Sequence, residues 1–391
     1  MRRETRAARP EAHFLAAPFE RTLRDYGHLI QHLARSGCDV HLWTMEPIDR
    51  GLAGELAPGL ACHRLPLLRG RQGPIDSART FLRGLRLALR KPDAIFTSWS
   101  VHTNLLCGTS LRLLDRRCVF LLAGMGSTFS SEALRFRLAR IVVVPAYRWL
   151  FAGSHSRVIV QNNDDLVYVC GALRVRREHV VLMSGCGVDP RAIPFIEPMP
   201  DRRPRVVLVP ARLLREKGIF EAAQASRLLL DRGVDHELWF SSDIDPANPH
   251  SLSRAEADAL PSWSPAIRVL GRQPSILPLL RDAHVVCLPT YREGLPTALI
   301  EAAACGRPIV TTDAIGPRDL VRHGDTGLLV PVRDPRALAD ALQRLLCDDL
   351  LAERLRRNAH AHFLHHCTRA ATLAQSLPAY HSLGLRDPAG P

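Results

Sequence analysis

The stretch YREGLPTALIEAAACGRP, Tyr291–Pro308, decides the fold of the second half of this chain. The run DAHVVCLPT just before it is apolar and rich in β-branched residues, which predicts a buried strand. Pro296 suits the start of a helix, and Gly306 suits its end. A strand followed at once by a loop and a helix is typical of an α/β domain. The stretch also places two carboxylates, Glu293 and Glu301, at the two ends of its loop-to-helix segment.

The residues upstream indicate what these carboxylates bind. The run RVVLVPARLLREKGIF predicts a strand, a loop that holds Arg212 and Lys217, and a helix from near Gly218. In an open α/β sheet the carboxyl ends of the strands line the ligand crevice, so both cations could reach one diphosphate at a helix N-terminus. Lys217 is one of only two lysines among the 52 lysine and arginine residues. A lysine at this position indicates that the site requires a compact positive charge rather than a guanidinium. Phosphate and hydroxyl groups together indicate a nucleotide sugar, although an isolated pair of glutamates is also typical of solvated surface charges.

Length and composition are those of a globular protein of two domains. The chain has 391 residues, of which 46% are hydrophobic and 23% charged. It contains no apolar run of the roughly 18 residues that cross a bilayer, and the arginine-rich Met1–Pro10 precedes no apolar signal region. We therefore expect a cytoplasmic protein. The ten cysteines are scattered, as reduced core thiols are.

The formal net charge of +13 is compatible with nucleic acid or with anionic lipid and phosphorylated ligands as partners. The arginines are spread along the chain without a nucleic-acid module, so we expect no nucleic-acid partner. The segment ALRFRLARIVVVPAYRWLFAG, 133–153, mixes arginines with large apolar residues. Such a segment can lie on the cytoplasmic membrane surface, which predicts a peripheral protein on its inner face. It could equally be an amphipathic helix packed on its own sheet.

Alternating helical and strand-like stretches run through both halves of the chain, which predicts parallel sheets with crossover helices. The proline-rich IPFIEPMPDRRPR near residue 200 reads as an interdomain linker. We expect an N-terminal domain over 1–195, a linker over 196–204, a nucleotide-sugar domain over 205–355 and a helical return with a tail over 356–391.

With these motifs in order, the chain resembles the retaining glycosyltransferases of family 4. The resemblance is carried by GCGVD, PARL-x3-KG, VLGRQPSI, the EGLPTALIEAAACGRPIVTTD block and HGDTGLLV in the C-terminal half. In the N-terminal half, TSWSVHTNLLCG, AGMGSTF and QNNDD are similar to bacterial enzymes that act on polyprenyl-diphosphate-linked saccharides. The resemblance implies an α/β protein of the GT-B fold. Two doubly wound Rossmann-like domains would face a cleft, and a C-terminal helix would cross back to the first.

The resemblance also implies roles for the residues of the second half. Arg212 and Lys217 would hold the donor diphosphate and offset the charge that develops on the leaving nucleotide. Glu293 would bind hydroxyls of the donor sugar, and Glu301 those of the ribose. Transfer would retain the anomeric configuration through front-face attack. The amides that would help to seat phosphate and sugar are those of Gly294 and Leu295.

Candidate contacts from the first domain to the sugar or the acceptor lie in the motifs of the N-terminal half. Many relatives carry a histidine before the glycine that matches Gly124, whereas this chain has an alanine there. His102 could replace that histidine or could be an ordinary histidine at a strand end. Asn104, Gly124 and Gly126 are further candidate contacts in the same motifs. The residues between Phe19 and Tyr26 show no readable acceptor motif.

We expect no metal and no cofactor. Asp243 and Asp245 form a D-x-D pattern like a metal signature, but they follow strand-like HELWF in the nucleotide domain. His365, His366 and Cys367 are adjacent on a predicted helix, where side chains diverge by about 100° and cannot converge on one ion.

The leading interpretation is an enzyme, a glycosyltransferase of the hexosyltransferase type. It would move a sugar from a UDP-sugar to a polyprenyl-diphosphate-linked saccharide in surface polysaccharide assembly. A nucleotide-sugar epimerase of the same fold is one alternative. A noncatalytic protein that docks on membrane or nucleic acid is the other.

Overall fold

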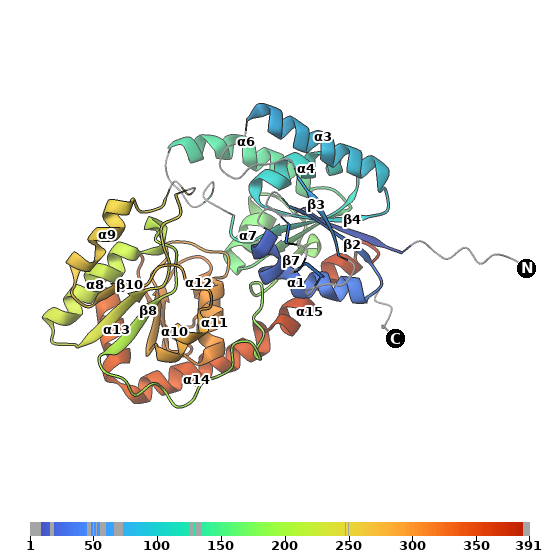
Figure 1. The fold of residues 1–391 in the computed structure, drawn as a ribbon. Helices are drawn as coiled ribbons and strands as arrows, with labels where there is room; N and C mark the ends of the chain where they lie inside the picture. Colours follow the sequence, from blue (N-terminus) through green and yellow to red (C-terminus); the bar gives the residue numbers. More distant parts are fainter. Residues whose placement is uncertain are drawn as a thin grey trace, which may run out of the picture. The chain divides into compact units, whose positions relative to one another are not determined.

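The computed structural model describes residues 9–15, 19–44, 48, 49, 51, 53, 54, 60–65, 73–125, 129, 134–246, 248 and 250–385. The chain divides into two compact units. The first comprises Met1–Met183 and Leu373–Pro391, and the second comprises Ser184–Thr372. Figure 1 shows the ribbon of both units.

The first unit is built on a seven-stranded parallel sheet in the order β3-β2-β1-β4-β5-β6-β7 among the described residues. Its strands are β1 Glu11–Leu15, β2 Asp39–Thr44, β3 Ala61–Arg64, β4 Ile95–Trp99, β5 Arg117–Leu122, β6 Ser156–Val160 and β7 Val180–Leu182. Its helices are α1 Phe19–Arg35, α3 Pro74–Arg90, α4 Val101–Leu113, α6 Leu134–Phe151 and α7 Asn163–Gly171. All five residues of β4 are buried, as expected for a central strand that helices cover on both faces.

A long helix at the end of the chain, α15 (Arg369–His381), belongs to this unit over most of its length. The buried hydroxyl of Tyr380 lies 3.0 Å from that of Thr97 on β4. Nη1 of Arg117 donates to the Leu383 carbonyl at 3.2 Å. The prediction that a C-terminal helix returns to the first domain is therefore confirmed (Figure 1).

The second unit contains a six-stranded parallel sheet in the order β10-β9-β8-β11-β12-β13. Its strands are β8 Arg205–Val209, β9 His236–Phe240, β10 Ile267–Val269, β11 Val285–Leu288, β12 Ile309–Thr312 and β13 Leu328–Val330. Its helices are α8 Ile219–Asp231, α9 Arg254–Trp263, α10 Leu277–Asp282, α11 Thr297–Cys305, α12 Pro317–Leu320, α13 Pro335–Cys347 and α14 Asp349–His366. A single apolar core packs the sheet against α8, α11, α13 and α14.

Both sheets have the strand order of a doubly wound fold, and the predicted fold class is confirmed. In each sheet the order reverses beside the first strand, between β1 and β4 and between β8 and β11. Loops that leave the carboxyl ends of two such strands diverge to opposite faces of the sheet, which opens a crevice for ligands. These two positions are where the candidate functional residues lie.

The division between the units differs from the boundaries that we expected from sequence. We expected the first domain to reach residue 195, whereas the second unit begins at Ser184. The reason is local packing: a Cβ on Gly185 would lie 2.6 Å from Ile300, and the backbone of Val188 pairs with Thr368, both within the second unit. The segment over 196–204 likewise belongs to the second unit, which runs to Thr372 rather than to 355.

Candidate functional site

Three of the residues proposed from sequence lie beyond the carboxyl ends of β8 and β11. Arg212 and Lys217 follow β8 in the loop that leads into α8. Glu293 follows β11 in the loop that leads into α11. The two loops leave neighbouring strands at the point where the strand order reverses, so the fold brings together side chains that are far apart in sequence.

Gly218 allows the two loops to approach closely. Its backbone is left-handed, with φ of 70°, and a Cβ there would lie 2.1 Å from the Pro289 carbonyl oxygen. The two loops are also joined by hydrogen bonds, because the Tyr291 N–H donates to the Glu216 carbonyl at 2.9 Å. The Thr290 hydroxyl donates to the same carbonyl at 3.1 Å. Only glycine combines this conformation with this approach, so Gly218 sets the spacing between the loops.

Lys217 and Glu293 form an ion pair across the two loops. Their side chains are 14% and 22% exposed, so the pair is shielded but reachable from solvent. The Glu293 N–H donates to the Ile315 carbonyl at 3.0 Å, which fixes the backbone of the loop. A Cβ on Gly316 would lie 2.5 Å from the Gly294 carbonyl oxygen, so this loop is also tightly covered from the side of β12. The pair is therefore held in place by backbone packing on two sides.

Arg212 pairs with a residue that sequence reasoning did not connect to it. Its Nη1 donates to Oδ2 of Asp245 at 2.6 Å. Asp243, the other acid of the D-x-D pattern, lies 3.4 Å from the Arg254 guanidinium. Each acid therefore faces an arginine. The pairing of Arg212 with Asp245 is not apparent from the sequence, because the two residues lie in loops that follow different strands, β8 and β9.

The remaining donor-site candidates lie in and before α11. Gly294 and Leu295 are buried in the loop, and Pro296 directly precedes the first helical residue. Glu301 is half-buried on the same helix. The helix ends at Gly306, which is left-handed with φ of 69° as its position after the helix predicts. The strand, loop and helix predicted from the opening stretch are confirmed.

In the first unit, two of the four sequence candidates line one pocket of about 260 Å³. Asn104 lies on the first turn of α4, and Gly124 follows β5. His102 is exposed and is not among the lining residues, and Gly126 lies outside the described residues. The full lining is Arg21, Asp25, Tyr26, Trp99, Ser100, Val101, Asn104, Leu121, Leu122, Ala123, Gly124, Met125 and Tyr147.

Sequence reasoning found no acceptor motif in α1, yet this helix contributes polar groups to the pocket. Asp25 is buried and accepts from Nε of Arg21 at 3.2 Å and from Nε of Arg24 at 2.9 Å. The Tyr26 hydroxyl accepts from Nε2 of Gln161 at 3.2 Å. A signal was available, because α1 follows the first strand of a doubly wound sheet and its start therefore lies at the ligand crevice.

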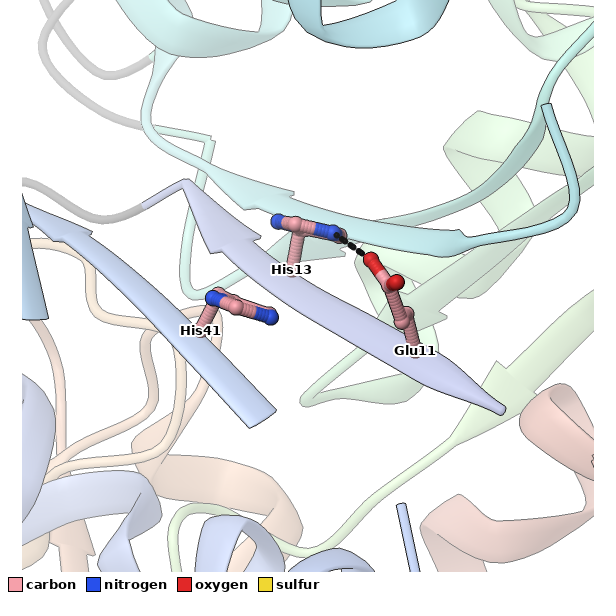
Figure 2. A group of neighbouring side chains, drawn as sticks. All are labelled: Glu11, His13 and His41. Carbon is pink, nitrogen blue, oxygen red and sulfur yellow. Dashed lines mark hydrogen bonds and ion pairs between the residues drawn. The ribbon is translucent and has the colours of Figure 1, made fainter. Parts of the chain in front are cut away.

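A carboxylate and two imidazoles gather on β1 and β2 (Figure 2), and their geometry can be tested against a metal site. The indole Nε1 of Trp43 can only donate, and it donates to Nδ1 of His13 at 3.1 Å. Nε2 of His13 therefore carries the proton that it shares with Glu11 at 3.1 Å, and it has no lone pair for an ion. The rings of His13 and His41 are stacked 4.5 Å apart at 8°, so their in-plane lone pairs do not converge. The arrangement fits a hydrogen-bonded stack better than a metal centre.

Burial shifts the titration of two groups near these sites. It lowers the pKa of His13 to about 4, although hydrogen bonding to Glu11 opposes the shift. It raises the pKa of Tyr147 to about 12, against a smaller lowering by a side-chain hydrogen bond with Asn104. At neutral pH His13 is uncharged, and Tyr147 keeps its proton and can act as a hydrogen-bond donor.

Residues 204–348 match the family described as glycosyl transferases group 1. This segment contains both loops of the Lys217–Glu293 site. A Campylobacter jejuni protein named N,N'-diacetylbacillosaminyl-diphospho-undecaprenol alpha-1,3-N-acetylgalactosaminyltransferase is 26% identical over 251 residues, which are 61% of this chain and 64% of the relative. The D-inositol 3-phosphate glycosyltransferase of Corynebacterium jeikeium is 32% identical over 48% of this chain and 47% of its own length. The chain thus matches less than two thirds of the length of these curated relatives.

Solved structures resemble the chain over nearly its whole length. A sucrose-phosphate synthase of Thermosynechococcus elongatus has a TM-score of 0.76 at 18% identity, and the match covers 96% of this chain and 99% of that one. Anabaena HepE in complex with UDP and glucose has a TM-score of 0.74 at 15% identity, covering 95% and 100%. At these identities the likeness establishes the fold, which is the two-domain fold of GT-B glycosyltransferases.

Proposed function

We propose that this chain, a group 1 glycosyltransferase by its family match and its fold, transfers a sugar from a UDP-sugar to a lipid-linked saccharide in bacterial surface polysaccharide biosynthesis. The observation that carries the proposal is the shielded Lys217–Glu293 pair at the switch point of the second unit. The donor is supported by the fold shared with a protein solved with UDP. The acceptor is supported by the relative that is named for a diphospho-undecaprenol substrate.

In the proposed mechanism Arg212 and Lys217 bind the donor diphosphate and offset the charge on the leaving nucleotide. Both cations are paired with carboxylates, so donor binding exchanges the Asp245 and Glu293 oxygens for phosphate oxygens. Glu293 is then free to accept hydrogen bonds from hydroxyls of the donor sugar. We further propose that Glu301 binds the ribose hydroxyls, that the amides of Gly294 and Leu295 seat the phosphate, and that transfer retains the anomeric configuration.

Two substitutions test the site. We expect Lys217→Ala and Glu293→Gln each to lower kcat/KM by about 100- to 1,000-fold, because each removes a contact to charge or hydroxyls in the transition state. Arg227→Ala is the matched control, since Arg227 lies on α8, is 61% exposed and pairs only with Asp231 among the described residues. The measurement is nucleotide release from a UDP-sugar in the presence of a lipid-linked saccharide. Turnover close to wild type in both site variants would refute the assignment.

We also propose that the protein binds the inner surface of the cytoplasmic membrane through α6. Figure 1 shows this helix in the first unit. Val143, Tyr147 and Leu150 are buried against the sheet, so part of the helix packs as an ordinary amphipathic helix does. A second apolar row is exposed: Leu134, Leu138, Ile141, Val142 and Trp149. Exposed Arg137 and Arg148 accompany this row, which suits an anionic bilayer. Within the described residues, no helix has the length and apolar character needed to span a membrane.

Vesicle co-sedimentation tests the membrane proposal. We expect binding to vesicles that contain phosphatidylglycerol, weak binding to phosphatidylcholine alone, and a loss of at least tenfold in partitioning for Ile141→Asp, which puts a charge into the exposed row. Val167→Asp is the control, because Val167 is 70% exposed on α7, away from that row. Equal losses in both variants, or no preference for anionic lipid, would contradict a role for α6.

A further inference from the structure

Arg333 has a backbone conformation that arginine rarely adopts. It lies in the short loop between β13 and α13, and its φ of 61° is left-handed. Left-handed backbone is disfavoured for a residue that carries a Cβ, and such residues cluster at functional sites. Because parallel strands end at one edge of their sheet, this loop lies at the same edge as the loops that carry Lys217 and Glu293. The side chain of Arg333 is therefore a candidate for a role at the site.

The guanidinium of Arg333 is stacked on the ring of Tyr291. Its Cζ atom lies 4.7 Å from the ring centroid. A cation over an aromatic face is attracted by the negative charge of that face. Arg333 forms no ion pair with an acid in the part of the chain that the structure describes. Its contact with Tyr291 is thus the interaction that places its charge.

Tyr291 is also held by α8. Its hydroxyl donates to Oε1 of Glu221, in the first turn of that helix, at 2.7 Å. Burial, with a smaller contribution from Glu221, raises the pKa of Tyr291 to about 12, against a lowering by a side-chain hydrogen bond with Arg333. The phenol therefore keeps its proton, and its hydrogen bond to Glu221, at neutral pH. The side chain of Tyr291 thus links the loops that follow β11 and β13 to the start of α8.

These contacts anchor residues next to the Lys217–Glu293 ion pair. Glu216, whose carbonyl accepts from the Tyr291 N–H, directly precedes Lys217, and Tyr291 is the second residue before Glu293. In the proposed mechanism the donor diphosphate takes the place of Glu293 beside Lys217, which removes one link between the two loops. Tyr291 provides a link that the donor does not break. Glu293 can then keep its position while its oxygens accept from the sugar hydroxyls.

We infer that Arg333 and Tyr291 are positioning residues for Glu293: Arg333 fixes the ring of Tyr291, and Tyr291 fixes the loop from which Glu293 reaches the donor sugar. The inference rests on the proposed function, because it concerns the contact of Glu293 with that sugar. A glycine would fit the backbone at position 333 without strain. The contact of the arginine side chain with Tyr291 accounts for an arginine in its place.

Replacing Arg333 by glycine separates this role from a purely structural one. Arg333→Gly removes the guanidinium but relieves the left-handed backbone, so we expect its Tm to stay within about 2 °C of wild type. We expect kcat/KM for the UDP-sugar to fall about tenfold, because Glu293 is held less precisely. The affinity for UDP alone should stay within about twofold of wild type, because UDP lacks the sugar that Glu293 contacts.

Arg174→Gly is the matched control. Arg174 is an exposed arginine of the first unit with φ of 57°, so its replacement relieves the same kind of strain outside the second unit. We expect wild-type turnover and a Tm equal to or above that of wild type. A tenfold fall in kcat/KM in this control as well would show that the loss does not depend on Tyr291, and would overturn the inference.

A double-mutant cycle tests whether Arg333 acts through Tyr291. Tyr291→Leu keeps apolar bulk but removes the aromatic face and the hydroxyl, so we expect a fall in kcat/KM at least as large as in Arg333→Gly. With both substitutions the fall should be no larger than in Tyr291→Leu alone. Additive losses would show that Arg333 acts independently of the tyrosine, and would overturn the inference.

The wild-type chain distinguishes failure of this inference from failure of the proposed function. Absence of both turnover and UDP binding in wild type would overturn both. Wild-type turnover that is unchanged in Arg333→Gly would overturn only the inference. A fall in kcat/KM that is accompanied by a lower Tm and weaker UDP binding would assign Arg333 a structural role, and would also overturn only the inference.

Discussion

Gly218 provides the sharpest test of how the second unit holds its site. In Gly218→Ala the new Cβ would lie 2.1 Å from the Pro289 carbonyl oxygen, and the residue would keep a left-handed φ of 70°. The conformation alone costs about 1–2 kcal/mol for a residue with a Cβ. The clash is with backbone, which cannot turn away, and overpacking of this kind adds about 1–3 kcal/mol. We therefore expect Gly218→Ala to lower the free energy of unfolding of the second unit by about 2–5 kcal/mol.

Gly233→Ala separates the two contributions. Gly233 lies just after the other end of α8, has φ of 75° and has no atom within 4 Å of an added Cβ. It should show only the conformational cost. Urea unfolding of the full chain measures both variants, and the transition that UDP shifts to higher urea identifies the second unit. Because the clash forces apart the loops that hold Lys217 and Glu293, Gly218→Ala should also weaken UDP binding at least tenfold, whereas Gly233→Ala should not. Equal stability and equal UDP affinity in the two variants would refute this account of the loops.

Two further predictions concern charge. Asp245→Asn removes the carboxylate that pairs with Arg212, so the guanidinium becomes available to phosphate. Because this ion pair is partly exposed, we expect UDP to bind the variant at most about fivefold more tightly, and we expect EDTA to have no effect on binding. Weaker binding that is sensitive to EDTA would indicate a metal at the D-x-D pattern instead. The pKa of His13 falls from 6.5 to about 4 on folding, so the unfolded chain binds a proton as the pH drops through this range and the folded chain does not. The first unit should lose about 3 kcal/mol of stability between pH 6.5 and 4 from this residue, and urea unfolding of His13→Phe should show a correspondingly smaller dependence on pH.

Local sequence was sufficient to predict the strand and the helices around the site of the second unit. The strand before Tyr291, the helix that ends at Gly306 and the helix that follows Gly218 were all predicted from apolar runs and from glycine and proline positions. These are properties of a few adjacent residues, so a single sequence contains them. The convergence of Lys217 and Glu293 was also expected, because parallel strands of a doubly wound sheet end at the same edge.

The features that sequence did not predict depend on contacts between distant segments. The pairing of Arg212 with Asp245 joins two loops whose spacing is set by the sheet, and no pattern in either loop indicates it. Helix α1 contributes Asp25 to the first-unit pocket, which is also lined by residues at the ends of β4 and β5. The start of the second unit at Ser184 depends on how Gly185 packs against Ile300, which the proline-rich run near residue 200 does not indicate.

Nucleotide release by the purified full chain tests the central claim most directly. The assay would combine UDP-, GDP- and ADP-sugars with and without a polyprenyl-diphosphate-linked saccharide. We predict that UDP is released from one donor, that release requires the lipid-linked saccharide, and that Glu293→Gln lowers kcat/KM for it by about 100- to 1,000-fold. Absence of release from every pair, together with absence of UDP binding, would contradict the assignment of this chain as a sugar transferase.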